Sequence, residues 1–306
     1  MFLLTFQRSL CYNQFDRGET RKQFIEILKV ILLGIIEGIT EWLPVSSTGH
    51  IILVDKIFRL NQTEQFKSVF YYFIQLGAIL AVVILFFKDI FPWKKQSVTL
   101  ANGERKNKIV ADKSVFSLWG KILVGCLPCA IVGILFEMPD NALVIALALI
   151  VYGVAFILVE NYNKKRTPIT NSVDEITYKQ ALIIGLFQVL AIIPGTSRSG
   201  ATILIALLLG ISRPAGAKFT FLLGIPVLIG AGGIQVLKYL LDYGMFSGAE
   251  IGYLLIGALV AFIVSMVAIK GLMKFVQKHD FKVFGWYRII LGAVVIGAIV
   301  IPALIG

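Results

Sequence analysis

The sequence predicts an all-α polytopic membrane protein with two inverted-topology repeats, each a re-entrant helical hairpin followed by three transmembrane helices. Three observations support this fold class. Hydrophobic residues make up 58% of the 306 positions and charged residues only 15%, a balance that is not typical of a water-soluble domain. Long apolar stretches alternate with shorter ones that polar runs interrupt. The two halves of the chain also resemble each other weakly.

Six apolar stretches reach the length of about 20 residues that a helix needs to cross a bilayer. They cover residues 66–87, 118–137, 140–160, 218–241, 249–270 and 286–305. Four further apolar pieces are shorter or interrupted, and they cover residues 24–43, 47–58, 180–193 and 200–211. Polar residues lie at the junctions of these short pieces. We therefore expect each pair of short pieces to form a hairpin that does not cross the membrane.

The two hairpins are related by a weak internal repeat with an offset of 151 residues. The matching positions are Gly34 and Gly185, Glu37 and Gln188, Ser46 and Ser197, Thr48 and Ser199, and Gly49 and Gly200. Three spans follow each hairpin, and because three is odd, the second half enters the membrane inverted. The predicted segments are an N-terminal extension (1–23), a first membrane repeat (24–160), a cytoplasmic linker (161–179) and a second membrane repeat (180–306).

Basic residues predict the orientation of this arrangement. The connections at 88–117, 161–179, 212–218 and 270–285 hold 17 of the 29 Lys and Arg residues, so we expect them to face the cytoplasm. Basic residues in the N-terminal extension run against this assignment. On this map the first hairpin opens to the outside and the second to the cytoplasm, and their tips meet near the middle of the membrane.

The net charge of +11 suits contact with the headgroups of anionic membrane lipids and also with an anionic substrate. Because the charge lies in loops between spans, nucleic acid is not an expected partner. Buried charges are costly in a membrane, at roughly 3 kcal/mol each on insertion scales, so the charged residues inside the hairpins indicate a functional site.

The first hairpin carries the run EGITEWLPVSSTGH from Glu37 to His50. Glu37 and Glu41 are four residues apart and project from one face of a helix, about 6 Å from each other. Two carboxylates at that separation hold a divalent cation or share a proton. The alternative is a structural pair that serine and threonine hydroxyls satisfy in the core.

A new helix is predicted to begin just after Pro44. Ser46, Ser47 and Thr48 are residue types that begin helices, and their hydroxyls and backbone N–H groups would face an anion at the helix N-terminus. His50 follows Ser47 by three residues, within one helical turn. This spacing allows a hydroxyl nucleophile and a proton acceptor to meet.

The second hairpin carries the run PGTSRSGAT from Pro194 to Thr202. Here the planar guanidinium of Arg198 is surrounded by the hydroxyl groups of Ser197, Ser199 and Thr202, a combination that favours phosphate. The alternative is that Arg198 neutralises a glutamate of the first hairpin, and the two roles can coexist. No glycine-rich lysine loop of the Walker type is present, which argues against nucleotide hydrolysis.

Both runs resemble the signature motifs of the bacterial undecaprenyl-diphosphatase family, also called bacitracin-resistance proteins, and the resemblance extends over residues 25–306. It implies a hydrolase that removes the terminal phosphate of the polyprenyl lipid undecaprenyl diphosphate. This reaction recycles the lipid carrier for peptidoglycan synthesis and confers resistance to bacitracin. The resemblance also implies a bacterial inner-membrane protein whose active site opens to the outer face, and a divalent cation, Mg or Ca. A homodimer is left open.

The resemblance also implies residue roles. The family's carboxylates correspond to Glu37 and Glu41, its hydroxyl and histidine to Ser47 and His50, and its phosphate-binding run to Ser197, Arg198 and Thr202. We expect the glutamates to hold the cation, with Ser46, Thr48 and Ser199 adding phosphate contacts. Either Ser47 or His50 attacks the phosphorus. The alternative function is a lipid-phosphate transporter or flippase of the same architecture, which would not require the Ser47 and His50 pair.

Overall fold

The computed structural model describes residues 2–99, 105–136 and 138–305. Within these residues, six helical segments are long and apolar enough to cross a membrane: α3 (Glu64–Leu85), α5 (Lys113–Leu135), α6 (Ala142–Asn163), α9 (Arg213–Tyr243), α10 (Gly248–Phe275) and Lys282–Ala303. The last segment comprises α11 (Lys282–Val295), the π-helical turn η2 (Ile296–Val300) and the start of α12 (Ile301–Ile305). These segments coincide with the six predicted stretches, so the predicted class of an all-α polytopic membrane protein is confirmed.

Two broken helical hairpins accompany these spans. The first joins α1 (Phe2–Thr40) to α2 (Ser47–Ile57), and the second joins α7 (Tyr178–Gln188) through the 3-10 turn η1 (Val189–Ile192) to α8 (Arg198–Leu208). The helices α2, α7 and α8 have 11 residues each. At about 1.5 Å per residue, each covers roughly half of a hydrocarbon core about 30 Å thick. None of the three is long enough to cross a bilayer.

The predicted N-terminal extension is not separated from the first hairpin by a break in secondary structure. Helix α1 continues from Phe2 to Thr40 and therefore passes through the predicted boundary at residue 23 without interruption. The division of the chain into an extension and two repeats stays a prediction.

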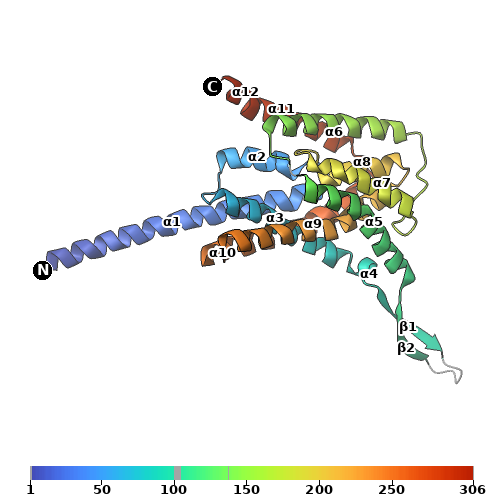
Figure 1. The fold of residues 1–306 in the computed structure, drawn as a ribbon, viewed down its shortest axis with the longest axis horizontal. Helices are drawn as coiled ribbons and strands as arrows, with labels where there is room; N and C mark the ends of the chain where they lie inside the picture. The colour runs from blue at the N-terminus through green and yellow to red at the C-terminus, as the bar shows by residue number, and fades with distance from the viewer. Residues whose placement is uncertain (1, 100–104, 137, 306) are drawn as a thin grey trace.

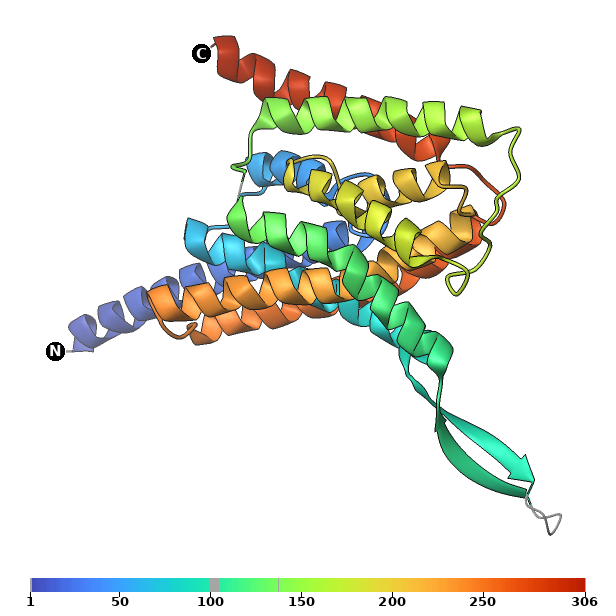
Figure 2. The same cartoon turned by 45° about the vertical axis from the view of Figure 1, so that its right-hand side comes forward.

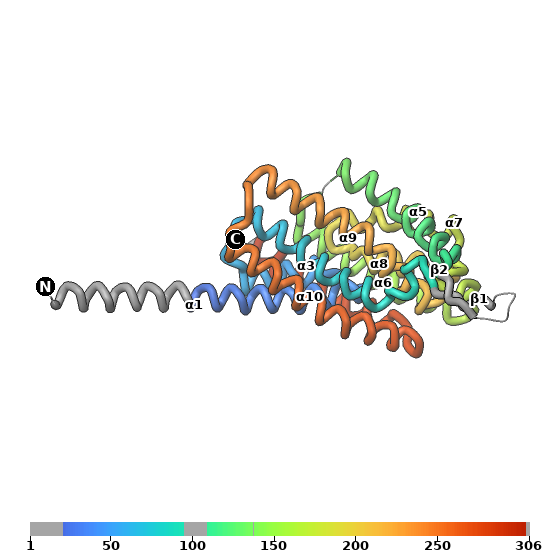
Figure 3. Tube along the Cα trace, turned by 90° about the horizontal axis from the view of Figure 1, so that it is seen from below, coloured from blue at the N-terminus to red at the C-terminus, as the bar shows by residue number. Residues whose placement is uncertain are grey.

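Helix contacts follow the same pattern in both halves of the chain. The helix α1 packs on α10, and α7 packs on α5, so the first helix of each hairpin rests on the second span of the other half. Corresponding spans also meet, because α3 packs on α9 and α6 packs on α11. Figures 1 and 2 show α6 and α11 together along one edge of the bundle, and Figure 3 shows α10 running beside α3. This exchange of partners supports the predicted repeat.

Glycines at equivalent positions allow the hairpin helices to approach these spans closely. A Cβ atom at Gly34 in α1 would lie 2.8 Å from the carbonyl oxygen of Gly257 in α10. A Cβ atom at Gly185 in α7 would lie 2.2 Å from the carbonyl oxygen of Gly125 in α5. Both positions exclude a larger residue at this separation of the helices. Small residues serve the same purpose wherever membrane helices pack through their backbones.

Polar and apolar side chains are arranged as expected for a protein in lipid. Large apolar side chains such as Ile134 and Val267 are exposed on the outside of the bundle. Charged and polar side chains such as Glu37, Gln188 and Arg288 are fully buried. Buried charges are costly in hydrocarbon. The chain therefore has its apolar side chains on the outside of the bundle and its charged and polar side chains between the helices.

The four basic connections gather at one end of the bundle, as the sequence predicts. Three contacts link them: Asp89 with Lys218 (2.9 Å), Thr170 with Ile211 through a β-bridge, and the Glu160 carboxylate with the backbone N–H of Phe281 (2.9 Å). Segments far apart in the sequence therefore meet at this end of the bundle, and the side of the membrane that it faces stays a prediction.

A β-hairpin at this end was not predicted. After the short helix α4 (Phe87–Ile90), the antiparallel strands β1 (Trp93–Thr99) and β2 (Arg105–Ala111) pair with Trp93 opposite Ala111, and they extend away from the bundle (Figure 1). Asp112 follows β2, caps α5 through the Ser114 N–H and forms an ion pair with Lys94. The hydrogen bonds from Lys94 and Ser114 lower the pKa of Asp112 to about 2. The base of the hairpin is thereby fixed to α5.

Candidate active site at the hairpin tips

The tips of the two hairpins have the same local structure. Ser46 caps α2 and Ser197 caps α8, and each serine has a left-handed backbone, with φ of 74° and 69°. Each side chain accepts a hydrogen bond from the glycine three residues on, at 3.4 Å from Gly49 N and 3.2 Å from Gly200 N. Left-handed serines are strained, and such strain persists only where the surrounding structure holds it, commonly at functional sites.

The two tips touch each other inside the bundle. The Ser199 hydroxyl donates to the carbonyl oxygen of Leu43 at 3.3 Å and also contacts the Ser197 hydroxyl at 3.1 Å. The Arg198 guanidinium pairs with the Glu41 carboxylate at 3.1 Å, and both side chains are almost completely buried. Residues of the two predicted motifs, 157 positions apart, therefore form one site.

The buried glutamates of the first hairpin differ in their partners. Glu41 pairs with Arg198, whereas neither carboxylate oxygen of Glu37 accepts a hydrogen bond from a donor among the described residues, and the Glu37 carboxyl lies within reach of the Glu41 carboxyl. Glu37 is fully buried and lies near the charges of Glu41 and Arg198. A buried carboxylate without a partner is costly and indicates a ligand or a proton at that position.

Arg198 is held so that one part of its guanidinium stays available. Its Nη1 donates to the carbonyl oxygen of Thr220 at 2.9 Å and its Nη2 bonds Glu41, while its buried Nε has no partner among the described residues. Gly224 of α9 provides the space, because a Cβ atom there would lie 2.8 Å from Nη2. The guanidinium is thus fixed against α9 and the first hairpin at once.

Thr202 supports this arrangement from inside α8. Its hydroxyl donates to the carbonyl oxygen of Arg198 at 2.9 Å and is 3.0 Å from the hydroxyl of Thr220. Because Thr202 is fully buried and bonded in both directions, the structure places it behind Arg198, where it positions the backbone. Its predicted contact with phosphate stays a prediction.

His50 is held by two groups other than Ser47. Its Nδ1 lies 2.7 Å from the carbonyl oxygen of Ser46, and its Nε2 lies 2.6 Å from the hydroxyl of Tyr287 in α11. A carbonyl only accepts, so Nδ1 carries a proton, and in the neutral ring Nε2 accepts from Tyr287. The lone pair that would serve a base is therefore directed at Tyr287, while Ser47 and Thr48 occupy the half-buried first turn of α2.

Sequence reasoning missed the residues that α11 and α7 add. Arg288 is fully buried and bonds both tips, and Tyr287 bonds His50. Both residues lie at the start of an apolar stretch, where an arginine is expected to anchor the helix at the membrane interface. The charge of Arg288 inside a predicted span was nevertheless a signal of a functional role. Gln188 is the repeat partner of Glu37, and its buried amide has no partner among the described residues.

The candidate cation site rests on Glu37. Its two open carboxylate oxygens are hard ligands that Mg²⁺ or Ca²⁺ prefers. No group of three or more His, Cys, Asp or Glu residues that could hold a metal occurs in the described part of the chain. Glu37, with Glu41 beside it, therefore fits a cation whose remaining ligands come from substrate and water.

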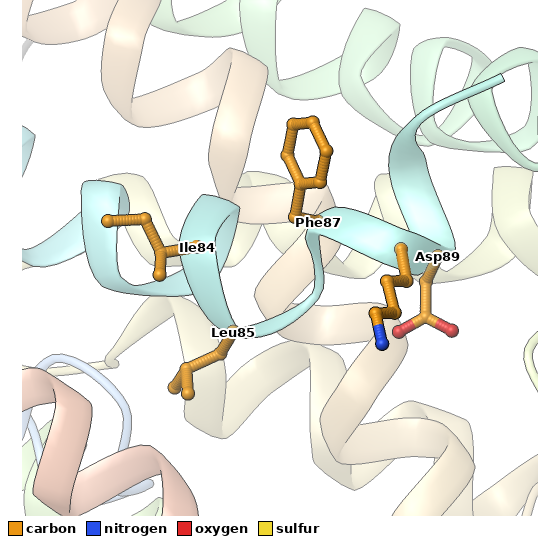
Figure 4. Close-up of a pocket in the computed structure, with 5 residues that line it drawn as sticks. Ile84, Leu85, Phe87 and Asp89 are labelled. Carbon is orange, nitrogen blue, oxygen red and sulfur yellow. The ribbon is translucent and has the colours of Figure 1, made fainter. Parts of the chain in front are cut away.

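A separate recess lies where α3 meets α4. It is lined by Ile84, Leu85, Phe87, Lys88 and Asp89, and Figure 4 shows Leu85 and Phe87 extending to opposite sides of the ribbon. None of these residues belongs to the hairpin tips. The recess lies at the basic end, where Asp89 bonds Lys218.

Comparison with known proteins agrees with the geometry of the tips. The family model described as bacitracin resistance protein BacA matches residues 30–294. An undecaprenyl-diphosphatase of Enterococcus faecalis is 54% identical over 278 residues, which is 89% of this chain and 97% of the relative. An undecaprenyl-diphosphatase of Lachnoclostridium phytofermentans is 53% identical over 279 residues, covering 90% and 97%. The chain therefore belongs to the bacitracin resistance protein BacA family.

Proposed function

We propose that the hairpin tips are the active site at which this chain hydrolyses undecaprenyl diphosphate to undecaprenyl phosphate and inorganic phosphate. The chain is a membrane phosphatase of the undecaprenyl-diphosphatase class, as its relatives at about 50% identity are. The observation that carries the site is the ion pair between Glu41 and Arg198, which joins the two motifs beside the starts of α2 and α8. Removal of the diphosphate also explains resistance to bacitracin, because bacitracin binds that lipid.

The diphosphate is bound by the second hairpin and by both helix starts. Arg198 has an unpaired Nε and shares its Nη2 with Glu41, so it can bind a phosphate oxygen with a charge-assisted hydrogen bond. The first backbone N–H groups of α2 and α8 lack partners within their helices, and the partial positive charge at a helix N-terminus favours an anion. Ser197 and Ser199 line the same position.

Ser47 is the proposed nucleophile. Its oxygen forms a bond to the terminal phosphorus while the bond from that phosphorus to the bridging oxygen breaks, and undecaprenyl phosphate leaves. The Ser47 proton passes to His50 Nε2, since Nδ1 is already protonated and bonded to Ser46. This transfer requires the bond between His50 and Tyr287 to open. Water then hydrolyses the phosphoserine, which releases inorganic phosphate and restores the Ser47 hydroxyl.

Glu37 and Glu41 are the proposed ligands of a divalent cation, Mg or Ca. When bound, the cation supplies charge neutralisation to the diphosphate. The protein's own contribution is a buried carboxylate with two open oxygens, Glu37, beside the carboxylate that orients Arg198. This division would leave Glu41 shared between the cation and the arginine.

The proposed location is the bacterial inner membrane, with the active site open to the outer face. The basic connections gather at one end of the bundle, and such an end faces the cytoplasm under the positive-inside rule. The first hairpin, which carries Ser47, then begins from the opposite end. The lipid substrate reaches the tips from within the membrane, where its polyprenyl chain stays in hydrocarbon.

The test is phosphate release from undecaprenyl diphosphate by detergent-purified protein. Arg198→Lys keeps a charge opposite Glu41 but loses the planar fork, so we expect release to fall roughly 100-fold or more. Arg166→Lys is the matched control, because Arg166 is exposed and contacts the Tyr162 ring. A chelator should abolish release by the wild type. Absence of release by folded wild-type protein would contradict the proposal and favour a transporter, which a vesicle flux assay would detect.

A further inference from the structure

Arg288 is a buried charge that the two motifs do not account for. It lies in α11, is fully buried, and has no carboxylate within ion-pair distance among the described residues. Two other arginines are paired with buried carboxylates, Arg198 with Glu41 and the partly exposed Arg213 with Glu160. A buried cation without an anionic partner is costly, so packing alone gives no reason to keep an arginine at this position.

The partners of Arg288 are backbone carbonyls from both hairpin tips. Its Nη1 donates to the carbonyl oxygen of Pro44 at 3.2 Å, in the first tip. Its Nη2 donates to the carbonyl oxygens of Gly195 and Thr196, both at 2.9 Å, in the second tip. A guanidinium can make these bonds simultaneously, because its donors point in fixed directions from one rigid plane.

These three carbonyls come just before the two strained helix caps. Pro44 precedes Ser46 by two residues, and Gly195 and Thr196 directly precede Ser197. Both caps have positive φ, so their backbone needs support from its surroundings. Arg288 supplies that support to both caps from one side chain, and it thereby fixes the separation of the helix starts at α2 and α8.

We propose that Arg288 is a positioning residue of the reaction, which locks the two hairpin tips in the register that brings Ser47 to the phosphate held by Arg198. This inference rests on the proposed function, because it assigns Ser47 and Arg198 to the reacting pair. Arg288 contacts the backbone and not the substrate. Its loss therefore disturbs the alignment of the reacting groups more than the binding of the lipid, and kcat falls while KM stays close to its wild-type value.

The test compares Arg288→Lys and Arg288→Ala with wild type in detergent, by phosphate release per folded molecule. Lysine keeps the charge but presents its donors from one point, so it cannot span the two tips. We expect kcat to fall roughly 100-fold, the effect of misplacing reacting groups by about 1 Å. Millimolar guanidinium should partly restore Arg288→Ala, whereas urea, a neutral molecule of the same shape, should not. Arg166→Ala serves as the matched control, because Arg166 is exposed and its guanidinium lies over the Tyr162 ring, much as that of Arg288 lies over the Tyr152 ring.

A second variant moves Arg288 without replacing it. A Cβ atom at position 200 would lie 3.0 Å from Nη1 of Arg288, so Gly200→Ala should displace the guanidinium by a few tenths of an ångström and lower kcat at unchanged KM. If neither Arg288 variant folds, the kcat of Gly200→Ala alone tests the proposal. Wild-type kcat in any folded variant, or a loss that guanidinium reverses no better than urea, would overturn the proposal. An inactive wild type would instead count against the proposed function.

Discussion

Single residues differ in how their buried charge is compensated. Glu160 accepts two hydrogen bonds from Arg213, at 2.9 Å and 2.5 Å, and its charge is fully matched. Glu37 accepts no hydrogen bond from a donor among the described residues, although it is buried as deeply. An ionised carboxylate in this state is costly, and a bound cation or a proton would relieve that cost.

We predict that Glu37→Gln uncouples stability from activity. The amide has nearly the same shape without the charge, so the melting temperature of the protein without cation should not fall. Phosphate release should fall roughly 100-fold or more, because a charged group of the site is lost. The upward shift of the wild-type melting temperature by Mg²⁺ or Ca²⁺ should disappear in the variant.

The matched control for this prediction is Glu250→Gln. Glu250 caps α10 at the end of the bundle and accepts hydrogen bonds from Ser247 and Tyr239, so its change should leave the cation-dependent shift intact. An unchanged cation shift in Glu37→Gln would remove Glu37 from the cation site.

At this scale the sequence predicted the charged residues of both motifs and offered a glutamate of the first hairpin as a partner of Arg198, and the structure identifies that glutamate as Glu41. Glu41 and Arg198 were recognisable because charges inside apolar pieces are rare. The pairing of Glu41 with Arg198, and the isolation of Glu37, depend on how the two tips meet in space. Arg288 escaped because its stretch begins at Trp286, so its position resembles an interface anchor.

At the scale of elements, the helix α9 determines where Arg198 can lie. Gly224 faces the guanidinium, whereas Gly230, further along the same helix, has open space around it. Alanine substitution at Gly224 affects both the Arg198 guanidinium and the helix propensity of α9, whereas at Gly230 it affects only the helix propensity.

We predict that Gly224→Ala lowers activity and Gly230→Ala does not. The methyl group at position 224 would lie 2.8 Å from the Arg198 guanidinium and displace it from Glu41, so phosphate release should fall about 10-fold or more. At position 230 alanine should stabilise the helix by up to about 1 kcal/mol. Steady-state release and thermal unfolding of both variants check this prediction, and equal activity of the two would contradict it.

The elements that sequence reasoning recovered are those with a strong physical signal. Spans are set by the thickness of hydrocarbon, and the short hairpin helices by the polar runs that interrupt them. The strands β1 and β2 of the β-hairpin do not alternate strictly between polar and apolar residues, so the sequence pattern predicts only a basic connection there. The Asn-Gly pair at 102–103 in the sequence is typical of hairpin turns and was the available signal.

At the scale of the whole molecule, exchange of partners between the halves brings the two tips together. The helices α1 and α7 each pack on a span of the other half, so neither hairpin is positioned by its own repeat alone. The basic end of the bundle predicts which hairpin opens to which side. The sequence predicted that the two tips meet, whereas the packing of each hairpin on the other half and the contact of Arg288 with both tips required the structure.

We predict that single cysteines report opposite sides of the membrane. In a background without the three native cysteines, Met245→Cys places a thiol in the exposed connection between α9 and α10, and Lys165→Cys places one in the exposed connection after α6, at the basic end. An impermeant maleimide should label position 245 in intact cells and position 165 only after permeabilisation. The reverse pattern would contradict the proposed orientation.

The most direct test of the central claim is to map the covalent phosphate. Protein mixed with undecaprenyl diphosphate is quenched during turnover and digested. Mass spectrometry of the peptides then locates the modification. One sample is kept free of acid to preserve phosphohistidine, and a second is treated with acid to destroy it. We expect phosphate on Ser47 in the wild type and none in Ser47→Ala, which should also lose phosphate release. Phosphate on His50, or normal release by Ser47→Ala, would contradict it.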